Sequence, residues 1–358
     1  MTREAPPVCS MRELDELLVA PDAGEHLSPI AGPGSLVVDL GRGAQAFCDE
    51  DAARLEAELA LLPCVTIGLG ETAEGSPARR VANACDVLIP EAGGLEPLLS
   101  GFRETPIAAL AFVQLLRGAP RRSIHEALVA ESFVYSTLQS GGEFRAWLAG
   151  HQSRRKQKRP VAEEPRACRL ERDRGRLDVR LSRPHKHNAF SRGMRDGLVE
   201  ALQLALCDSS IEEVVLSGEG DSFCSGGDLD EFGSFPDPAE AHAIRTTRSP
   251  ALLMARLRDR LRVEVHGACI GAGVELPAFS AHVVASEDAY FGLPEVGLGL
   301  VPGAGGTASL PLRIGRQRTA WLGLSGERID ARTALAWGLI DEVRLVQHFA
   351  APETGGRG

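Results

Sequence analysis

Two glutamates, Glu275 and Glu295, stand twenty residues apart in apolar, glycine-rich surroundings in the second half of the chain. Two carboxyls that face one pocket can serve as general base and general acid, because close like charges disfavour double ionisation and apolar surroundings raise the pKa. We expect the pair to share a proton at one reacting centre, and the sequence leaves open which carboxyl is ionised at rest. Taken alone, Glu275 would be an ordinary carboxylate at a helix start and Glu295 a surface acid.

Two glycine-rich turns accompany these acids. Gly226-Gly227-Asp228 lies in GEGDSFCSGGDLDEFG, and Gly271-Ala272-Gly273 lies in GACIGAGVELPAF, separated from Glu275 by one residue, Val274. Small residues leave the backbone N–H groups of such turns open to a ligand. The N–H of Gly227 and the N–H of Ala272 can therefore point at one carbonyl oxygen, as an oxyanion hole requires. A helix that begins near Ala272 would add its positive dipole end.

The elements that would position these residues alternate between strand and helix patterns, which is typical of an α/β fold. The helix over 191–206 has Ser191 as its N-cap, a residue type that favours a helix start. The patterns predict strands over 177–182, 212–218, 262–267 and 282–286, and helices over 191–206 and 331–339.

The first half repeats this rhythm more weakly and then changes. Strands are predicted over 35–41, 64–70 and 81–90, with a helix over 50–62, whereas residues 105–150 show helical patterns only. The polar, mostly basic stretch 151–165 follows. We predict that it is a solvated linker, with a phosphate site as the alternative.

Composition excludes several classes of protein. A net charge of −10 argues against a nucleic-acid-binding protein. Charged residues interrupt every apolar run before it reaches the roughly 20 residues that a membrane span needs. The amino terminus lacks the basic and apolar segments of a secretory signal, so we expect a cytoplasmic protein. The eight cysteines are spread singly, so neither a disulfide framework nor a metal site is expected, and Cys224 reads as a small buried thiol.

Five motifs in order identify a resemblance to the crotonase superfamily, the enoyl-CoA hydratases and isomerases, over residues 170–347. This resemblance implies a core of ββα turns arranged in a spiral and an acyl-coenzyme A thioester as ligand. Coenzyme A is then part of the substrate, and no separate cofactor is expected. The motifs are RPHKHNAF (183–190), SFCSGGDLDEF (222–232), VHGACIGAGVEL (265–276), YFGLPEVGLGLVPGAGGT (290–307) and ERIDARTALAWGLIDEV (327–343).

The same resemblance implies roles for single residues. The oxyanion donors are the N–H groups of Gly227 and Ala272; the family usually has glycine at the latter position, but a backbone donor survives an added methyl group. Glu275 and Glu295 match the two glutamates that hydratases use on one water. Arg183 or Lys186 could meet coenzyme phosphates, with a solvated loop charge as the simpler alternative. The remaining expected substrate contacts are Ser225, Gly226, Asp228 and Gly303.

The helices of residues 105–150 resemble the tail that crotonases carry after their core. We therefore interpret the chain as two crotonase units: a degenerate α/β half over 1–104 with its helical tail or lid over 105–150, and a catalytic core over 166–347 followed by a disordered tail over 348–358. The tail helices would cover the core of their own chain or of a neighbour in a homo-oligomer. Val113 and Gln114 replace the lysine that family tails often place near the coenzyme. Four aromatic residues are expected at the lid or interface, or in the core of the first half: Phe133, Tyr135, Phe144 and Trp147.

The leading hypothesis is an enoyl-CoA hydratase-type lyase that uses Glu275 and Glu295. The same oxyanion hole would serve an enoyl-CoA isomerase or an acyl-CoA hydrolase. A non-catalytic acyl-CoA-binding subunit is the alternative from a different class, suggested by the degenerate first half.

Overall fold

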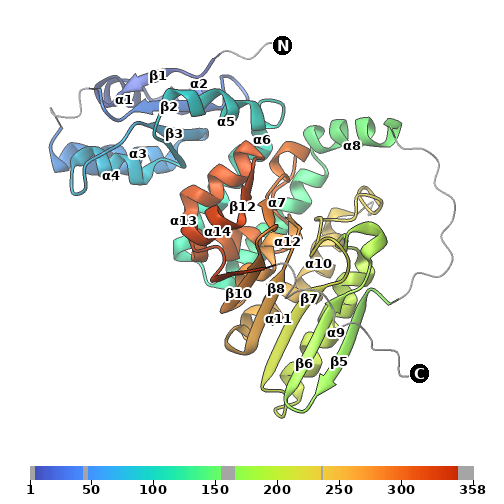
Figure 1. Ribbon diagram of the computed structural model, residues 1–358. Coiled ribbons are helices and arrows are strands. Elements are labelled where there is room, and N and C mark those ends of the chain that lie inside the picture. Colours follow the sequence, from blue (N-terminus) through green and yellow to red (C-terminus); the bar gives the residue numbers. More distant parts are fainter. Residues whose placement is uncertain (1–4, 43–46, 155–165, 235–236, 346–358) are drawn as a thin grey trace, which may run out of the picture.

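The computed structural model describes residues 5–42, 47–154, 166–234 and 237–345 of the 358-residue chain. Its amino-terminal part is built on a parallel sheet with the strand order β1-β2-β3-β4 (Figure 1). The strands are β1 (Val8–Ser10), β2 (Ser35–Asp39), β3 (Val65–Leu69) and β4 (Val87–Ile89), and the helical elements are α1 (Met11–Leu18), α2 (Ala23–Leu27), α3 (Asp49–Leu61), α4 (Pro77–Ala84), the 3-10 turn η2 (Ala92–Gly94) and α5 (Leu95–Phe102).

The apolar run of β2 is explained by burial on both faces of this sheet. Leu36 and Val38 pack into a small cluster with the apolar faces of α3 and α4. Val37 points the other way and joins the large core that continues into the rest of the chain. Because side chains alternate along a strand, a strand buried on both sides reads as a continuous apolar run.

The predicted strand over 81–90 was too long. Ser76 caps α4 by accepting the Arg79 N–H, and Pro77 occupies the first helical position. These start signals carry the helix through Ala84, so the strand contains only Val87–Ile89. The interpretation of this half as a degenerate crotonase unit stays a prediction.

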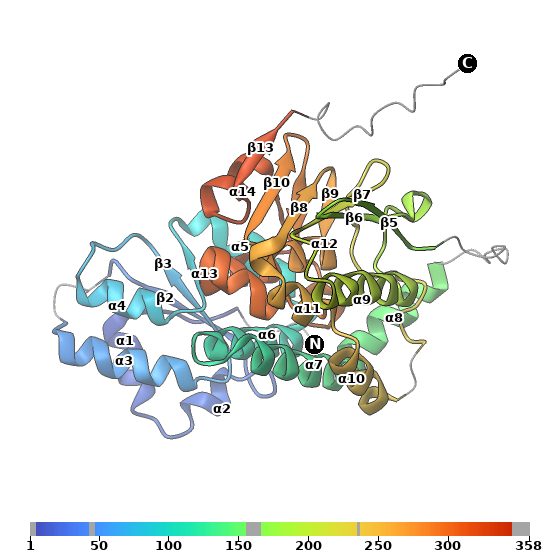
Figure 2. The same ribbon diagram turned by 90° about the horizontal axis from the view of Figure 1, so that it is seen from below.

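Three helices follow where residues 105–150 predict helices only. α6 and α7 pack against α13 (Gly306–Ser325) of the same chain, and both views place them beside it (Figures 1 and 2). The ring of Phe112 occupies the space that a side chain on Gly323 would need, so the tail helices and the core share one apolar interior. The segment consists of α6 (Pro106–Gly118), η3 (Ala119–Arg121), α7 (Ile124–Gln139) and α8 (Gly142–Arg154).

A buried ion pair ties α6 to the first sheet. The Arg117 guanidinium donates to both carboxyl oxygens of Asp86, at 2.8 and 2.6 Å, and to the carbonyl oxygens of Leu62 and Cys64. Asp86 also accepts from the N–H and the hydroxyl of Thr66. The carboxylate thus has a full set of donors although it is 1% exposed.

The second half contains a six-stranded sheet with the order β13-β10-β8-β7-β6-β5, in which β5 is antiparallel to β6 and the other neighbours are parallel. A smaller sheet has the order β12-β11-β9. The strands are β5 (Cys168–Asp173), β6 (Arg176–Leu181), β7 (Glu213–Gly218), β8 (Leu261–Val265), β9 (Ala268–Ile270), β10 (His282–Ser286), β11 (Tyr290–Gly292), β12 (Arg328–Asp330) and β13 (Glu342–Arg344).

The helices of this half follow pairs of strands. β8, β9 and α12 form one ββα unit, and β10, β11 and α13 form the next, which is the repeat that the resemblance implies. Ser191 caps α9 by accepting the Met194 N–H, as its sequence predicts. The helical elements are η4 (Pro184–Lys186), α9 (Arg192–Cys207), α10 (Pro238–Thr247), α11 (Pro250–Arg256), η5 (Arg258–Arg260), α12 (Ala272–Glu275), η6 (Pro277–Phe279), η7 (Val296–Leu298), α13 and α14 (Ala331–Trp337).

The linker predicted over 151–165 begins inside α8, which continues to Arg154, and its remainder lies outside the described residues. The tail predicted over 348–358 also lies outside them. Among the residues that the structure describes, no helix is both long and apolar enough to cross a bilayer.

Candidate active site

The two glycine-rich turns lie against each other. Backbone hydrogen bonds link Cys224 to Ala268 and Ile270 at 3.0 and 2.9 Å, which sets the two segments side by side. Gly226 and Gly271 both have positive φ, +95° and +51°, a conformation that glycine adopts without strain. Just beyond these glycines, the N–H groups of Gly227 and Ala272 donate to no protein acceptor within the described ranges.

Glu275 is held by the loop that precedes α13. Its side chain is 1% exposed, and its Oε2 accepts hydrogen bonds from the N–H of Ala304 at 2.7 Å and of Gly306 at 2.8 Å. The short helix α12 begins directly after Gly271 and carries this carboxyl into the interior. The Gly306 Cα faces the Glu275 side chain so closely that a β-carbon there would lie 2.8 Å from Cγ of Glu275.

Glu295 reaches the same place from the loop after β11. Its Oε1 occupies the space beside Gly271, a point that is also in contact with the Cα of Gly226. Its Oε2 is buried and has no hydrogen-bond partner among the described residues. Because buried polar atoms are normally hydrogen-bonded, this unpartnered oxygen indicates a place where a polar ligand would bind.

Burial raises the pKa of both carboxyls. The pKa of Glu275 lies well above its ordinary value, first because of desolvation and then because of repulsion from Glu295 and from Glu131. Burial, together with repulsion from Glu131, raises the pKa of Glu295 to about 7. A carboxyl with a pKa of about 7, such as that of Glu295, can exchange protons near neutral pH, as general acid–base catalysis requires.

Glu131 on α7 is a third buried carboxyl that the sequence reasoning missed. It is 2% exposed and accepts from the N–H groups of Gly305 and Thr307 and from the Thr307 hydroxyl, at 2.8, 2.8 and 2.6 Å. Burial raises its pKa to about 7 in spite of these donors. The sequence pattern that could have identified Glu131 is its helical spacing from Ala127, Tyr135 and Leu138, which places the acid on the inward face of α7.

Tyr135, one turn after Glu131, also enters the site. Its ring fills the space that a side chain on Gly303 would need, and the Arg245 guanidinium carbon lies 4.7 Å from the ring centroid. Burial raises the pKa of its hydroxyl, and the charges of Glu295, Glu275 and Glu131 raise it further. Gly303 therefore contacts the tail helix, so the site is assembled from both halves of the chain.

The two cationic residues expected at the coenzyme both bind Asp228 of the turn 226–228, and a contact with coenzyme phosphates stays a prediction. Arg183 is 1% exposed and donates to the Ala189 carbonyl and to Asp228, at 2.9 and 3.0 Å. Lys186, which is partly exposed, donates to Asp228 at 3.0 Å and to Asp230 at 2.9 Å. Asp228 is 5% exposed and forms ion pairs with both cations, directly after Gly227 in the chain.

The other sequence candidates lie around this centre. The N–H of Ser225 donates to the His187 carbonyl and the Gly226 carbonyl accepts from Phe190, so both residues shape the first turn. Burial raises the pKa of the Cys224 thiol to about 12, which leaves it an unreactive packing residue. Of the tail side chains, Phe133 is exposed, Trp147 is partly buried, and Phe144 and Val113 are buried in the core.

Comparison with known proteins identifies the family. A family model described as Enoyl-CoA hydratase/isomerase matches residues 171–350. The chain belongs to this family. As an enoyl-CoA hydratase/isomerase family member it is similar to proteins named for reactions of acyl-CoA thioesters, and it is an enzyme of that family.

The matches to individual relatives cover the second half of the chain. It is 38% identical over 170 residues to the 2,3-dehydroadipyl-CoA hydratase of Escherichia coli K12, covering 47% of this chain and 65% of the relative. It is 31% identical over 201 residues to the 1,2-epoxyphenylacetyl-CoA isomerase of the same strain, covering 52% and 77%. A crystal structure of enoyl-CoA hydratase from Mycobacterium smegmatis aligns with a TM-score of 0.47 and 33% identity, over 51% of this chain and 72% of that one. This enoyl-CoA hydratase/isomerase family member thus spans about two thirds of the length of its relatives.

Proposed function

We propose that this enzyme adds water across the double bond of a 2-enoyl-CoA thioester. The observation that carries the proposal is the buried pair Glu275 and Glu295 beside two turns whose N–H groups, at Gly227 and Ala272, have no protein acceptor within the described residues. The names of the two bacterial relatives, one a hydratase and one an isomerase, both refer to acyl-CoA thioesters and support a thioester substrate.

In this mechanism the thioester oxygen lies between the N–H groups of Gly227 and Ala272. One carboxylate takes a proton from water as the water oxygen bonds to C3, and the electron pair of the double bond moves to form an enolate whose oxygen the two N–H groups hold. The other carboxyl gives its proton to C2. Coenzyme A enters and leaves as part of the substrate, and the two carboxyls exchange protons between turnovers.

Purified full-length protein incubated with crotonyl-CoA tests the proposal. Hydration removes the conjugated double bond, so we expect the absorbance of the enoyl thioester to fall and 3-hydroxybutyryl-CoA to accumulate. A 3-enoyl-CoA that is converted while crotonyl-CoA stays unchanged would instead favour isomerisation. Release of free thiol would favour hydrolysis, and saturable binding without turnover would favour a non-catalytic subunit.

A further inference from the structure

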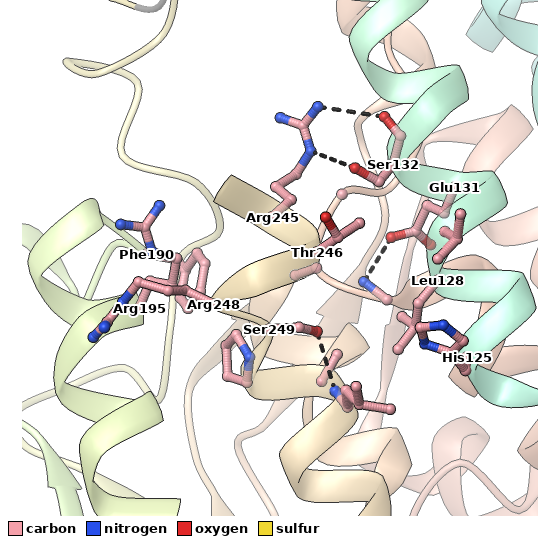
Figure 3. A pocket seen from close by; sticks show the side chains of 17 residues that line it. His125, Leu128, Glu131, Ser132, Phe190, Arg195, Arg245, Thr246, Arg248 and Ser249 are labelled. Atoms are coloured by element: carbon pink, nitrogen blue, oxygen red, sulfur yellow. Dashed lines mark hydrogen bonds between the residues drawn. The ribbon is translucent and has the colours of Figure 1, made fainter. Parts of the chain in front are cut away.

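A small cavity opens between the tail helix α7 and the helices α9, α10 and α11 of the core. Its volume is about 60 Å³, which is room for about four water-sized groups. Leu128 and Leu252 contribute apolar walls, and Arg195, Arg245 and Arg248 contribute guanidinium groups. Figure 3 shows Arg195 and Arg248 beside Phe190 on one side of the cavity, with Arg245 facing Ser132 of α7 on the other.

This cavity touches both parts of the candidate site. Gly303, Ala304 and Gly305 line it, and the N–H of Ala304 holds Glu275. Phe190 lines the far side of the cavity. The carbonyl of Phe190 accepts from the Asp228 N–H at 2.9 Å, and the Phe190 N–H donates to the Gly226 carbonyl at 2.7 Å, so Phe190 is bound to the turn 226–228. Contacts of its lining residues thus connect the cavity with Glu275 and with the turn 226–228.

Positive charge exceeds negative charge along the wall formed by α9 and α10. Arg195 and Arg248 share the carboxylate of Asp196, at 2.9 and 2.6 Å, and Arg248 also lies 3.8 Å from the exposed carboxylate of Glu200. Arg245 donates to neutral oxygens of Ser132, Ser136 and Gln139 and, within the described residues, forms no ion pair. Glu131 also lines the cavity, but its carboxyl is held by the N–H groups of Gly305 and Thr307. Three guanidinium groups against one lining carboxyl favour an anionic ligand, and their planar donors fit a carboxylate.

We propose that this cavity binds a carboxylate at the distal end of a short acyl group, so that the preferred substrates are coenzyme A thioesters of short dicarboxylic acids. The volume accommodates one methylene and one carboxylate beyond C3 of the acyl chain, which corresponds to a glutaryl skeleton. A coenzyme phosphate that meets the same guanidinium groups, with its adenosine outside the cavity, is the alternative that the binding test separates from this one. The inference rests on the proposed function for the placement of the thioester.

Binding of saturated thioesters tests the cavity without requiring turnover. Glutaryl-CoA, pentanoyl-CoA and free coenzyme A are titrated into the full-length protein and followed by calorimetry. We expect glutaryl-CoA to bind at least tenfold more tightly than pentanoyl-CoA. Equal affinity for the two would overturn the inference while leaving hydration of crotonyl-CoA untouched. Failure of both thioesters to bind would overturn the proposed function as well.

Single Arg→Gln substitutions test which guanidinium groups bind the distal carboxylate. Arg248→Gln should weaken glutaryl-CoA about tenfold and leave pentanoyl-CoA unchanged, and Arg245→Gln should do the same if its melting temperature matches the parent. Arg256→Gln removes the same charge from an exposed position on α11 and should change neither affinity. If Arg248→Gln weakens glutaryl-CoA, pentanoyl-CoA and coenzyme A equally, the guanidinium contacts the coenzyme and the inference is wrong.

Discussion

The carboxyl of Glu295 occupies the space that a side chain on Gly271 would need. Gly271 also has a φ of +51°, in the region that disfavours every residue with a β-carbon. Glycine is therefore required at position 271 for two reasons: the positive φ of the backbone and the space that the Glu295 carboxyl occupies. This relationship places Glu295 next to the Ala272 N–H, where the proposed chemistry needs it.

Gly271→Ala should reduce turnover of crotonyl-CoA by about a hundredfold, since the added methyl displaces Glu295 by the order of an ångström. Gly315→Ala is the matched control, because Gly315 has a φ of +78° but open space around it. Its ψ of 158° lies outside the left-handed helical region, so that variant should lose about 1–3 kcal/mol of stability to backbone strain, with its activity kept. Similar turnover in both variants would argue against Glu295 in catalysis.

Glu295→Gln should lower kcat about 10²- to 10⁴-fold, the usual contribution of a general acid or base. The amide keeps the shape of the side chain, so binding of a saturated thioester should persist. Glu287→Gln, at an exposed acid between β10 and β11, should retain full activity. Turnover unchanged in Glu295→Gln would remove that residue from the mechanism.

Glu131→Gln should shift the acidic limb of the kcat profile to lower pH. The charge of Glu131 raises the pKa of Glu295 and of Glu275, so its removal lowers both values. Glu143→Gln is the control, since Glu143 also accepts two backbone N–H groups, those of Ile107 and Ala108, but does not perturb the two catalytic candidates. An unshifted profile in Glu131→Gln would limit Glu131 to a structural role.

Stability should depend on pH through the same carboxyls. The pKa of Glu295 is about 7 in the fold against 4.5 in an unstructured chain, so the folded state holds this proton more tightly. Its contribution to the free energy of unfolding is complete below about pH 4.5 and is lost as the pH rises to about 7. Glu295→Gln should therefore gain stability over the parent in urea unfolding at pH 8 but not at pH 4.5. An equal difference at both values would contradict the raised pKa.

Arg117→Met should destabilise the chain by about 3 kcal/mol, the lower end of the range for a broken buried ion pair, because the buried Asp86 carboxylate then keeps only Arg316, 3.8 Å away, as a cation. Arg103→Met removes an exposed partner of Glu96 and should cost about 0–1 kcal/mol. Chemical unfolding of the two variants checks the difference. Equal stabilities would mean that α6 is not anchored to the first sheet through this pair.

The sequence by itself predicted the α/β class, the helices of residues 105–150 and the four backbone and side-chain groups of the candidate site. Local signals suffice for these features, since glycine turns, caps such as Ser191 and the order of the motifs lie within short stretches. The strand predicted over 81–90 was too long, because apolar content alone does not separate a buried helix face from a strand. The Ser76-Pro77 start signal makes residues 77–84 helical and leaves only Val87–Ile89 as a strand.

Only the tertiary structure decided which residues meet across long separations. Glu131 accepts from Gly305 and Thr307, more than 170 positions away, because α7 packs against α13. From the sequence, Arg183 is predicted to be able to meet a coenzyme phosphate. In the structure its side chain is buried and donates to Asp228. Burial and the pairing of charges depend on the packing of distant elements, which spacing along the chain does not encode.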